Sequence, residues 1–403
     1  MKKRVMILGA SRYYARSILA AKELGFETVV TDRTPNADGF RHADYHEVVD
    51  VTDISGSIEV ARKYGIDGIL ALNDFGVPTA AVVAKTLGLA GINPEVAKYA
   101  TSKVWMRKKW EEAGIPSAKF RVAKTLNEAY AAVEELNVWP LVLKPTDSRG
   151  GASRGVSKVD EWGQLEWAFA FAQSFYEDKS VIIEEYLEGV EHSIEMLTYE
   201  GKMYVLAVSD KVKTPPPYRV DKSVIYPTIF TGAELKRIHA WAEEAVRAIG
   251  IDTGAAHVEM CTTKDGPRLF ELGARCGGGG IPDPIVPFVT GIEMLKESVR
   301  IAVGEKPGNL APLYTRGCVY RFITPHPGRV RRVTGLDEVR AWKHILDSEV
   351  LVKEGGEIRP VRIGPDRAGF IIAGGETRRE AIDLADRAEA SICFEYWEEG
   401  KSS

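Results

Sequence analysis

The sequence predicts a mixed fold, in which an α/β domain with a parallel sheet is followed by α+β units. Short apolar runs alternate with helix-compatible stretches over residues 1–95, which is the pattern of β-α-β units whose helices cover a sheet. Farther along, strand-like segments are joined by turn residues, which favours antiparallel pairing. A length of 403 residues, at about 100–200 residues per domain, provides for two to three domains.

The composition is that of a globular protein and excludes several classes. Hydrophobic residues make up 45% and charged residues 27%, which excludes a disordered or fibrous chain. The net charge of -4 favours neither nucleic acid nor an anionic membrane as a partner. No apolar run approaches the roughly 18 residues of a membrane span, so we expect a cytoplasmic protein. The cysteines lack CxxC spacing, and neither a zinc site nor a disulfide framework is predicted for Cys261, Cys276, Cys318 and Cys393.

The N-terminal domain, residues 1–95, is expected to begin with a strand at 5–10, a helix at 16–25 and a strand at 28–32. The turn Gly9-Ala10-Ser11-Arg12 lacks the GxGxxG spacing that brings a backbone close to a pyrophosphate. We therefore interpret it as a tight strand-to-helix turn, which disfavours a nicotinamide-dependent oxidoreductase. Asp32 ends the second strand, where a helix cap or turn residue is as frequent as a ribose ligand.

The central segment, residues 96–304, is expected to begin with one helical stretch that ends at Gly114-Ile115-Pro116. Three consecutive prolines predict a surface or lid loop over 211–223. The C-terminal unit, residues 305–403, is expected to hold short strands and a helix. The other expected elements are a small lid subdomain over about 117–188, strands at 141–145 and 180–187, a helix at 234–250, and the strands AAHVEM and RLFEL ahead of a glycine run.

Lys144 stands at the end of a strand and is followed by a glycine-rich loop over 147–155. Glycines and serines let backbone N–H groups converge on an anion, while the lysine and an arginine of the loop supply positive charge. The loop is not a P-loop, because GxxxxGK[ST] is absent. Taken alone, a phosphate cradle and a plain hairpin are equally supported.

Three glutamates gather around the next strand, namely Glu184, Glu185 and Glu191. A strand that ends in a short linker can offer backbone groups to a base, and a carboxylate that follows it can accept from ribose hydroxyls. Taken alone, these glutamates are more typical of a solvated acidic edge.

Glu259 and Glu271 lie in two successive strands that are joined by the turn TKDGPR. An antiparallel hairpin would bring both carboxylates to neighbouring positions. A hard cation such as Mg2+, held by these carboxylates and by nucleotide phosphate oxygens, offsets their repulsion. Arg275 follows directly ahead of the glycine run. Its guanidinium can stabilise a phosphorylated or tetrahedral species, or else pair with Glu271.

The order of these features resembles the ATP-grasp superfamily of carboxylate–amine ligases. The resemblance covers nearly the whole chain, through TSKVWMRKKWEEAGIPSAKF, LVLKP with its glycine loop, VIIEEYLEGVEHS, HVEM and FELGARCGGGG. The segment GFIIAGGETRREAIDLADRA is similar to the closing domain of biotin carboxylase and amino-acid ligases. The resemblance implies an ATP-grasp fold with a Rossmann-like domain over 1–95, an ATP-grasp domain over 96–304 and a small α+β domain over 305–403.

The resemblance also implies roles for individual residues. Lys103 and Lys144 match the family's phosphate-contacting lysines. Glu259 and Glu271 match its magnesium ligands, and Arg275 matches the arginine that steadies the acyl phosphate and the tetrahedral intermediate. The other residues expected to bind ATP are Ser148, Gly150, Gly151, Ser153 and Arg154 in the flap over the triphosphate, Glu184, Glu185 and Leu187 at the adenine hinge, Glu191 at the ribose, and Lys211 or Lys213 as an additional phosphate contact or a solvated lysine.

The reaction that the resemblance implies is ATP-dependent formation of an amide. A carboxylate attacks the γ-phosphate of ATP to give an acyl phosphate and ADP, and an amine then displaces phosphate. The cofactors implied are ATP and Mg2+, or Mn2+ in its place. The partners implied are small-molecule carboxylate and amine substrates, and a homodimer is the commonest expectation for a soluble enzyme. The C-terminal segment favours the amino-acid ligase branch.

Alternatives within and beyond this class stay open. Gly273 stands where many members have the asparagine of ELNAR, which completes the metal shell, so a non-catalytic nucleotide-binding module is one alternative. A purine-type or bicarbonate-using ligase is another, and it would need Arg316 and Arg321 to form a sugar-phosphate pocket. The loop over 211–223 is a candidate substrate cover, with Tyr218 or Arg219 near an amino-acid carboxylate. A thiol nucleophile at Cys276 is disfavoured, since no histidine is adjacent.

Overall fold

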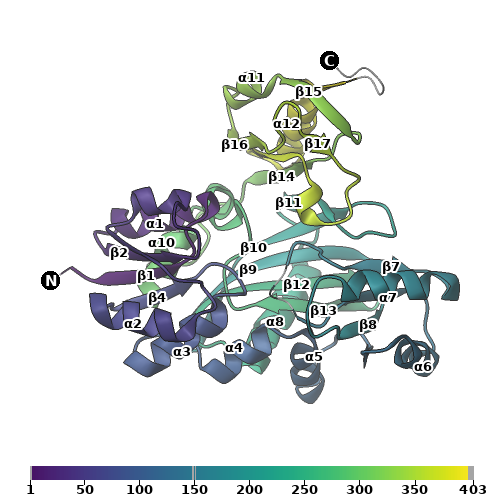
Figure 1. Cartoon of the computed structure of the whole chain (residues 1–403), viewed down its shortest axis with the longest axis horizontal. Coiled ribbons are helices and arrows are strands. Elements are labelled where there is room, and N and C mark those ends of the chain that lie inside the picture. Colours follow the sequence, from purple (N-terminus) through teal and green to yellow (C-terminus); the bar gives the residue numbers. More distant parts are fainter. Residues whose placement is uncertain (1, 148, 150, 398–403) are drawn as a thin grey trace.

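The computed structural model describes residues 2–147, 149 and 151–397 (Figure 1). Its N-terminal unit is a parallel sheet with the strand order β3-β2-β1-β4 and helices on both faces. The apolar run Val5–Leu8 is fully buried in β1 at the centre of this sheet. The unit comprises β1 (Arg4–Leu8), α1 (Ala15–Glu23), β2 (Glu27–Asp32), β3 (Tyr45–Val48), α2 (Ile54–Tyr64), β4 (Gly68–Ala71) and α3 (Val77–Leu87), with short 3-10 turns at Arg12–Tyr14 and Asp38–His42.

Two helices, α4 (Pro94–Ala100) and α5 (Lys103–Glu112), stand where the sequence predicted one. The expectation of a continuous helix is therefore wrong. The break falls at Ser102, whose hydroxyl caps α5 by accepting from the backbone N–H of Trp105. Ser102 also forms an isolated bridge with Asp147, so the start of α5 is fixed beside the glycine-rich loop. This break places Lys103 in the lining of the cleft described below.

A small subdomain follows, built on a sheet with the order β5-β8-β6-β7. Thr125 and Glu128 form a reciprocal capping box that starts its first helix. Buried aliphatic side chains of β6 and β8, such as Leu143 and Ile183, pack against both helices of the subdomain. Its elements are β5 (Phe120–Ala123), α6 (Leu126–Leu136), β6 (Leu141–Pro145), β7 (Ser157–Val159), a 3-10 turn at Trp162–Gln164, α7 (Leu165–Gln173) and β8 (Val181–Glu185).

The central sheet is antiparallel and continues from the middle of the chain into the C-terminal unit, with the order β13-β12-β9-β10-β11-β14-β18-β16. Pairing of β11 with β14, for example Ser223 with Arg321, joins the two parts. Its core packs against α8 on one side. The elements before the C-terminal unit are β9 (Val190–Tyr199), β10 (Lys202–Lys213), β11 (Asp221–Tyr226), α8 (Gly232–Ile249), β12 (Gly254–Thr263), β13 (Gly266–Gly273), an irregular turn at Ile281–Ile285, α9 (Val286–Thr290) and α10 (Met294–Ala302).

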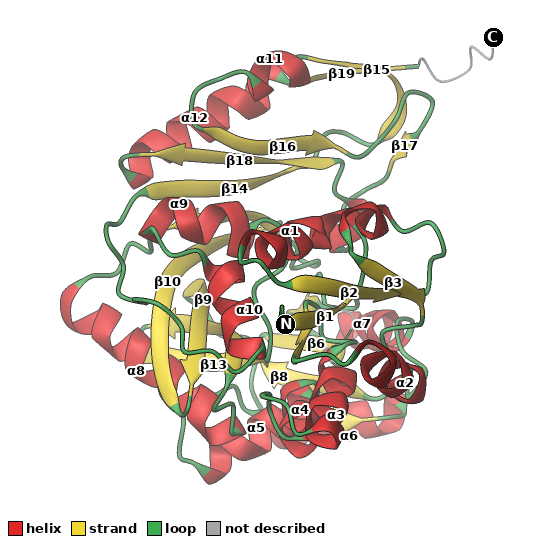
Figure 2. Cartoon of the chain, turned by 90° about the vertical axis from the view of Figure 1, so that its left-hand side faces the viewer, coloured by secondary structure: helices red, strands yellow, loops and turns green. Residues whose placement is uncertain are grey.

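The C-terminal unit lies above the rest of the molecule in Figure 2, with α12 over one face of β14, β18 and β16. A second sheet, β17-β15-β19, flanks it. The unit comprises β14 (Gly317–Ile323), β15 (Gly328–Thr334), α11 (Leu336–Arg340), β16 (Ile345–Val350), β17 (Glu357–Ile358), a 3-10 turn at Gly364–Asp366, β18 (Gly369–Gly375), α12 (Arg378–Ser391) and β19 (Cys393–Tyr396).

The predicted fold class is confirmed, while the domain boundaries at 95 and 304 stay predictions. One helix before the second boundary, α10, packs on α1 and β4 of the N-terminal unit. A Cβ added at Gly68 would lie 2.2 Å from the carbonyl oxygen of Ala302, so this glycine permits the close approach. Among the described residues, no helix has the length and apolar character needed to span a membrane.

The proline-bearing segment differs from its expected form. Strand β10 extends through Lys213 and β11 begins at Asp221, so only residues 214–220 connect the two strands. Lys211 and Lys213 therefore belong to a strand, where their side chains reach carboxylates of the cleft. Tyr218 packs against Trp167 of α7, with ring centroids 5.6 Å apart, and thus anchors the connection to the small subdomain.

Candidate active site

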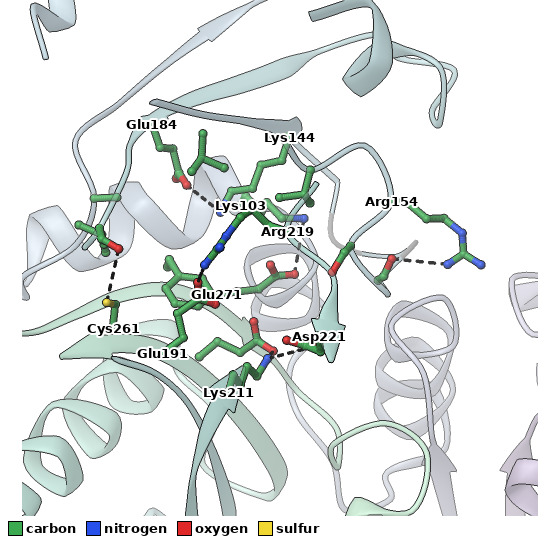
Figure 3. Close-up of a pocket in the computed structure, with 18 of the residues that line it drawn as sticks. Lys103, Lys144, Arg154, Glu184, Glu191, Lys211, Arg219, Asp221, Cys261 and Glu271 are labelled. Carbon is green, nitrogen blue, oxygen red and sulfur yellow. Dashed lines mark hydrogen bonds and ion pairs between the residues drawn. The ribbon is translucent and has the colours of Figure 1, made fainter. Parts of the chain in front are cut away.

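A cleft lies between the sheet of the small subdomain and the central sheet (Figure 3). Ser148 and Gly150 lie outside the described residues. The structure places every other predicted site residue at this cleft, namely Lys103, Lys144, Gly151, Ser153, Arg154, Glu184, Glu185, Leu187, Glu191, Glu259, Glu271 and Arg275.

Lys144 on β6 is held by a buried ion pair. Its Nζ lies 2.7 Å from Glu184 Oε2, and Arg107 Nη2 of α5 lies 2.6 Å from Glu184 Oε1. Burial alone would raise the pKa of Glu184, but the positive charges of Arg107 and Lys144 outweigh it and lower that pKa. Glu184 was expected at the adenine hinge, yet its side chain is 2% exposed and is occupied by these two cations. The carboxylate therefore fixes Lys144 at the cleft.

We expect Glu184→Gln to lower the free energy of unfolding by about 3–5 kcal/mol, because it leaves two buried cations without their counter-charge. Urea unfolding monitored by circular dichroism measures this loss. The control Glu135→Gln breaks an exposed pair with Arg121 and should cost no more than about 1 kcal/mol. Similar losses for both variants would contradict the structural role of Glu184.

The hinge after β8 runs past Glu185, Tyr186 and Leu187. The carboxylate of Glu185 accepts from the backbone N–H of Lys119 at 2.8 Å and also binds Arg268. The Leu187 carbonyl accepts from the Cys261 thiol. The side chain of Glu185 thus supports the hinge, and contact of the hinge backbone with an adenine stays a prediction.

Glu191 at the start of β9 meets two cations from the neighbouring hairpin. Its carboxylate lies 3.0 Å from Lys213 Nζ and 3.0 Å from Arg219 Nη2. Burial would raise its pKa, but these charges lower it. Lys211 binds Glu259, and Asp221 lies 2.7 Å from Lys213. Strand β10 therefore adds two cations, Lys211 and Lys213, to the lining of the cleft. The sequence left open whether either lysine contacts phosphate or is solvated.

Glu259 on β12 and Glu271 on β13 are direct partners in the antiparallel register. Lys211 binds the first carboxylate, and Lys103 Nζ lies 3.5 Å from the second. Two neighbouring carboxylates, open to the phosphate oxygens of a nucleotide, fit the oxygen ligands that Mg2+ takes. Among the residues that the structure describes, no group of three or more histidine, cysteine, aspartate or glutamate side chains has metal-binding geometry, so phosphate or water would have to complete the coordination.

His257 and Glu195 complete the carboxylate side of the cleft. His257 Nδ1 lies 2.6 Å from Glu195 Oε1, and its Nε2 lies 3.2 Å from Glu259 Oε1. Burial opposes the charge of His257, but the two carboxylates outweigh it and raise the pKa to about 9. Glu195 also accepts from the backbone N–H of Gly277 at 2.9 Å. The motif HVEM contained His257, but no sequence signal indicated that Glu195 faces it.

The protonation of His257 gives the nucleotide-free protein a pH-dependent stability. Because its folded pKa is raised from 6.5 to about 9, its contribution is complete below pH 6.5 and is lost as the pH rises through 9. We expect wild-type stability to fall more between about pH 6.5 and 9.5 than that of His257→Gln. Urea midpoints at both pH values, without Mg2+, measure the difference. The exposed His326→Gln should behave as wild type, and parallel losses in all three proteins would contradict the assignment.

Arg275 pairs with the N-terminal unit rather than with Glu271. Its Nε and Nη2 donate to the carboxylate of Asp74 at 3.0 and 2.7 Å. A Cβ added at Gly273 would lie 3.0 Å from Asp74 Oδ1 and 3.3 Å from Arg275 Cζ. The glycine that departs from the ELNAR pattern thus leaves room for this forked pair, which fixes the guanidinium beside the cleft.

Two parts of the chain match known families. Residues 137–283 match the ATP-grasp domain, and residues 321–396 match the L-amino acid ligase C-terminal domain 2. The chain contains an ATP-grasp domain. Its strands β6 to β13 carry the cleft, so the family match and the site geometry coincide.

Among the curated relatives and similar solved structures are amino-acid ligases and a formyltransferase. The chain is 26% identical over 328 residues to the L-arginine-specific L-amino acid ligase of Bacillus subtilis, covering 78% of this chain and 77% of that protein. It is 29% identical over 421 residues to the formate-dependent phosphoribosylglycinamide formyltransferase of Burkholderia cenocepacia, covering 96% and 95%. The crystal structure of L-amino acid ligase from Bacillus licheniformis superimposes with a TM-score of 0.84 at 23% identity, covering 98% and 99%. These comparisons confirm the enzyme class expected from the sequence, an ATP-dependent ligase that forms carbon–nitrogen bonds.

A second, larger cleft opens between the ATP-grasp domain, the N-terminal unit and the C-terminal unit. Lys211 and Asp221 of the segment 211–223 line it and Tyr218 and Arg219 do not, so a substrate cover formed by this segment stays a prediction. Apolar side chains form much of its wall, namely Val224, Ile281, Leu295, Tyr320, Phe322 and Phe370.

Proposed function

We propose that the chain joins a carboxylate to an amine at the expense of ATP, through an acyl phosphate. The observation that carries this proposal is the junction of the two clefts. Residues that line both include Lys211, His257, Glu259 and Arg275. A nucleotide in the first cleft would thus direct its terminal phosphate toward a substrate in the second, with cations on both sides of the reacting atoms.

Each step has a group of the chain to support it. Lys103 and Lys144 bind the phosphates of ATP, while Glu259 and Glu271 hold Mg2+, which supplies charge neutralisation of the phosphate oxygens when bound. A carboxylate oxygen of the substrate attacks the γ-phosphorus, and the bond to ADP breaks. The amine nitrogen then attacks the acyl carbon and phosphate leaves. Arg275, oriented by Asp74, stabilises the negative charge of the tetrahedral intermediate.

No nucleophile from the protein is required. Cys276 beside Arg275 is buried, and burial raises the pKa of its thiol to about 12, so it stays protonated at neutral pH. Its Sγ lies 3.4 Å from Ser298 Oγ. This environment supports a packed cysteine and removes the alternative of thiol catalysis.

The substrate class proposed is amino acids. It is supported by the C-terminal domain match and by the likeness to L-amino acid ligases. A purine-type ligase would need Arg316 and Arg321 at the substrate, but Arg316 pairs with Glu376, and Arg321 pairs with Asp386 and Glu389. Neither arginine lines either cleft. The position of both residues therefore disfavours that branch.

The test is ADP release from Mg-ATP in the presence of pooled amino acids and small carboxylates, with hydroxylamine added in parallel. We expect substrate-dependent ADP and a hydroxamate, which forms when hydroxylamine captures the acyl phosphate. Deconvolution of the pool then names the carboxylate. Nucleotide binding without ADP from any pool would contradict the ligase and favour a non-catalytic module.

A further inference from the structure

The glycine-rich loop meets the C-terminal unit where two backbones approach closely. The backbone N–H of Gly364 donates to the carbonyl oxygen of Ala152 at 2.8 Å. A Cβ added at Gly364 would lie 2.8 Å from Ala152 Cβ and 2.9 Å from Ala152 O. The φ angle of Gly364 lies outside the left-handed region, so the close approach and not the backbone conformation requires glycine.

The turn that presents this N–H is itself fixed. The carboxylate of Asp366 accepts from the backbone N–H groups of Arg362 and Ile363, each at 2.9 Å. These bonds close the 3-10 turn Gly364–Asp366 on its N-terminal side. Because these hydrogen bonds fix the turn, the backbone N–H of Gly364 has a defined position relative to β18.

Arg367, directly after the same turn, reaches Asp221, which binds Lys213 of the nucleotide cleft. The guanidinium of Arg367 lies over the ring of Phe322, 3.6 Å from its centroid, and its Nη2 is 3.9 Å from Asp221 Oδ2. Asp221 in turn binds Lys213 at 2.7 Å. One short segment of the C-terminal unit therefore touches both the glycine-rich loop and the carboxylate that holds Lys213.

We propose that Gly364 is a positioning residue, which docks Ala152 and the described loop residues 151–155 on the C-terminal unit. Gly151, Ser153 and Arg154 line the nucleotide cleft, and docking holds them against it. The C-terminal unit thereby contributes to the covering of the nucleotide. The catalytic consequence rests on the proposed function, because exclusion of water preserves an acyl phosphate.

The first test measures access to this loop and needs no substrate. Trypsin cuts after arginine, and Arg149 and Arg154 both lie in the loop. With Mg2+ and a non-hydrolysable ATP analogue present, we expect trypsin to cut Gly364→Ala there at least about fivefold faster than wild type. The methyl group added by this substitution would push residues 151–155 away from the C-terminal unit and so expose them. The control is Gly163→Ala, since an added Cβ there meets no heavy atom within 4 Å. Equal cleavage rates in all three proteins would overturn the proposal, whether or not the chain is a ligase.

A second variant separates docking from a general loss of stability. Ala152 has a φ of 52°, which glycine adopts without strain. Ala152→Gly in the Gly364→Ala background removes one of the two close contacts and should restore part of the protection from trypsin. With the substrates identified, Gly364→Ala should release more ADP per amide formed than wild type. Failure of the second substitution to restore protection would overturn the docking assignment.

Discussion

Replacement of Glu271 by glutamine is expected to lower kcat by at least about 100-fold, while the dissociation constant of the nucleotide changes far less. Glu271 lies opposite Glu259 in the β12–β13 pairing, and the two carboxylates form the proposed Mg2+ site. Glutamine keeps the shape of the side chain and removes its charge. The charge matters most where it develops on the transferred phosphoryl group, so the loss falls mainly on turnover.

The measurement pairs steady-state ADP release with binding of a fluorescent ATP analogue at saturating Mg2+. Glu134→Gln, on the exposed face of α6, is the matched control and should retain wild-type values. Wild-type turnover in Glu271→Gln would remove this carboxylate from the metal site. A large loss of binding with unchanged kcat would instead assign Glu271 to ground-state binding.

Replacement of Arg275 by alanine is expected to lower kcat for amide formation by about 10²–10³-fold. ATP binding should remain close to wild type, because Lys103 and Lys144 supply the phosphate contacts in the proposed site. Arg275→Lys keeps the positive charge but loses the two parallel hydrogen bonds of the guanidinium to Asp74. Its activity should therefore lie between those of Arg275→Ala and wild type.

Product formation is measured by mass spectrometry, alongside ATP binding and thermal unfolding. Arg247→Ala, which removes an exposed pair with Glu244 on α8, controls for the loss of an arginine as such. Equal losses of ATP binding and product in Arg275→Ala would show that the pair with Asp74 is structural. Near-normal activity of Arg275→Ala would exclude a role at the intermediate.

Many residues that line the cleft could be named from short sequence motifs, because each motif lies within one strand or loop. Lys144, Glu259 and Glu271 each lie in or at the end of a strand that its own apolar pattern predicts, and the turn between β12 and β13 fixes the register of the two glutamates. The hairpin was therefore predictable from local signals. The pairing of β12 with β9, which brings Glu195 to His257, was not predictable from local signals.

The residues that sequence reasoning missed act through contacts between distant segments. Asp74 and Arg275 are 201 positions apart, and a single sequence does not show which acid a given arginine meets. Arg107 appeared only as one basic residue of a helix, although it is fully buried against Glu184. Gly364 gave no signal either, because its role comes from the approach of another backbone.

The central claim is that a substrate carboxylate becomes an acyl phosphate, and oxygen-isotope transfer tests it most directly. The carboxylate substrate found with the pooled amino acids is labelled with 18O on both oxygens and turned over with Mg-ATP and the amine. One labelled oxygen should appear in each phosphate released, because the carboxylate oxygen that attacks phosphorus leaves with it. Unlabelled phosphate alongside amide formation would contradict the mechanism proposed for this ATP-grasp domain.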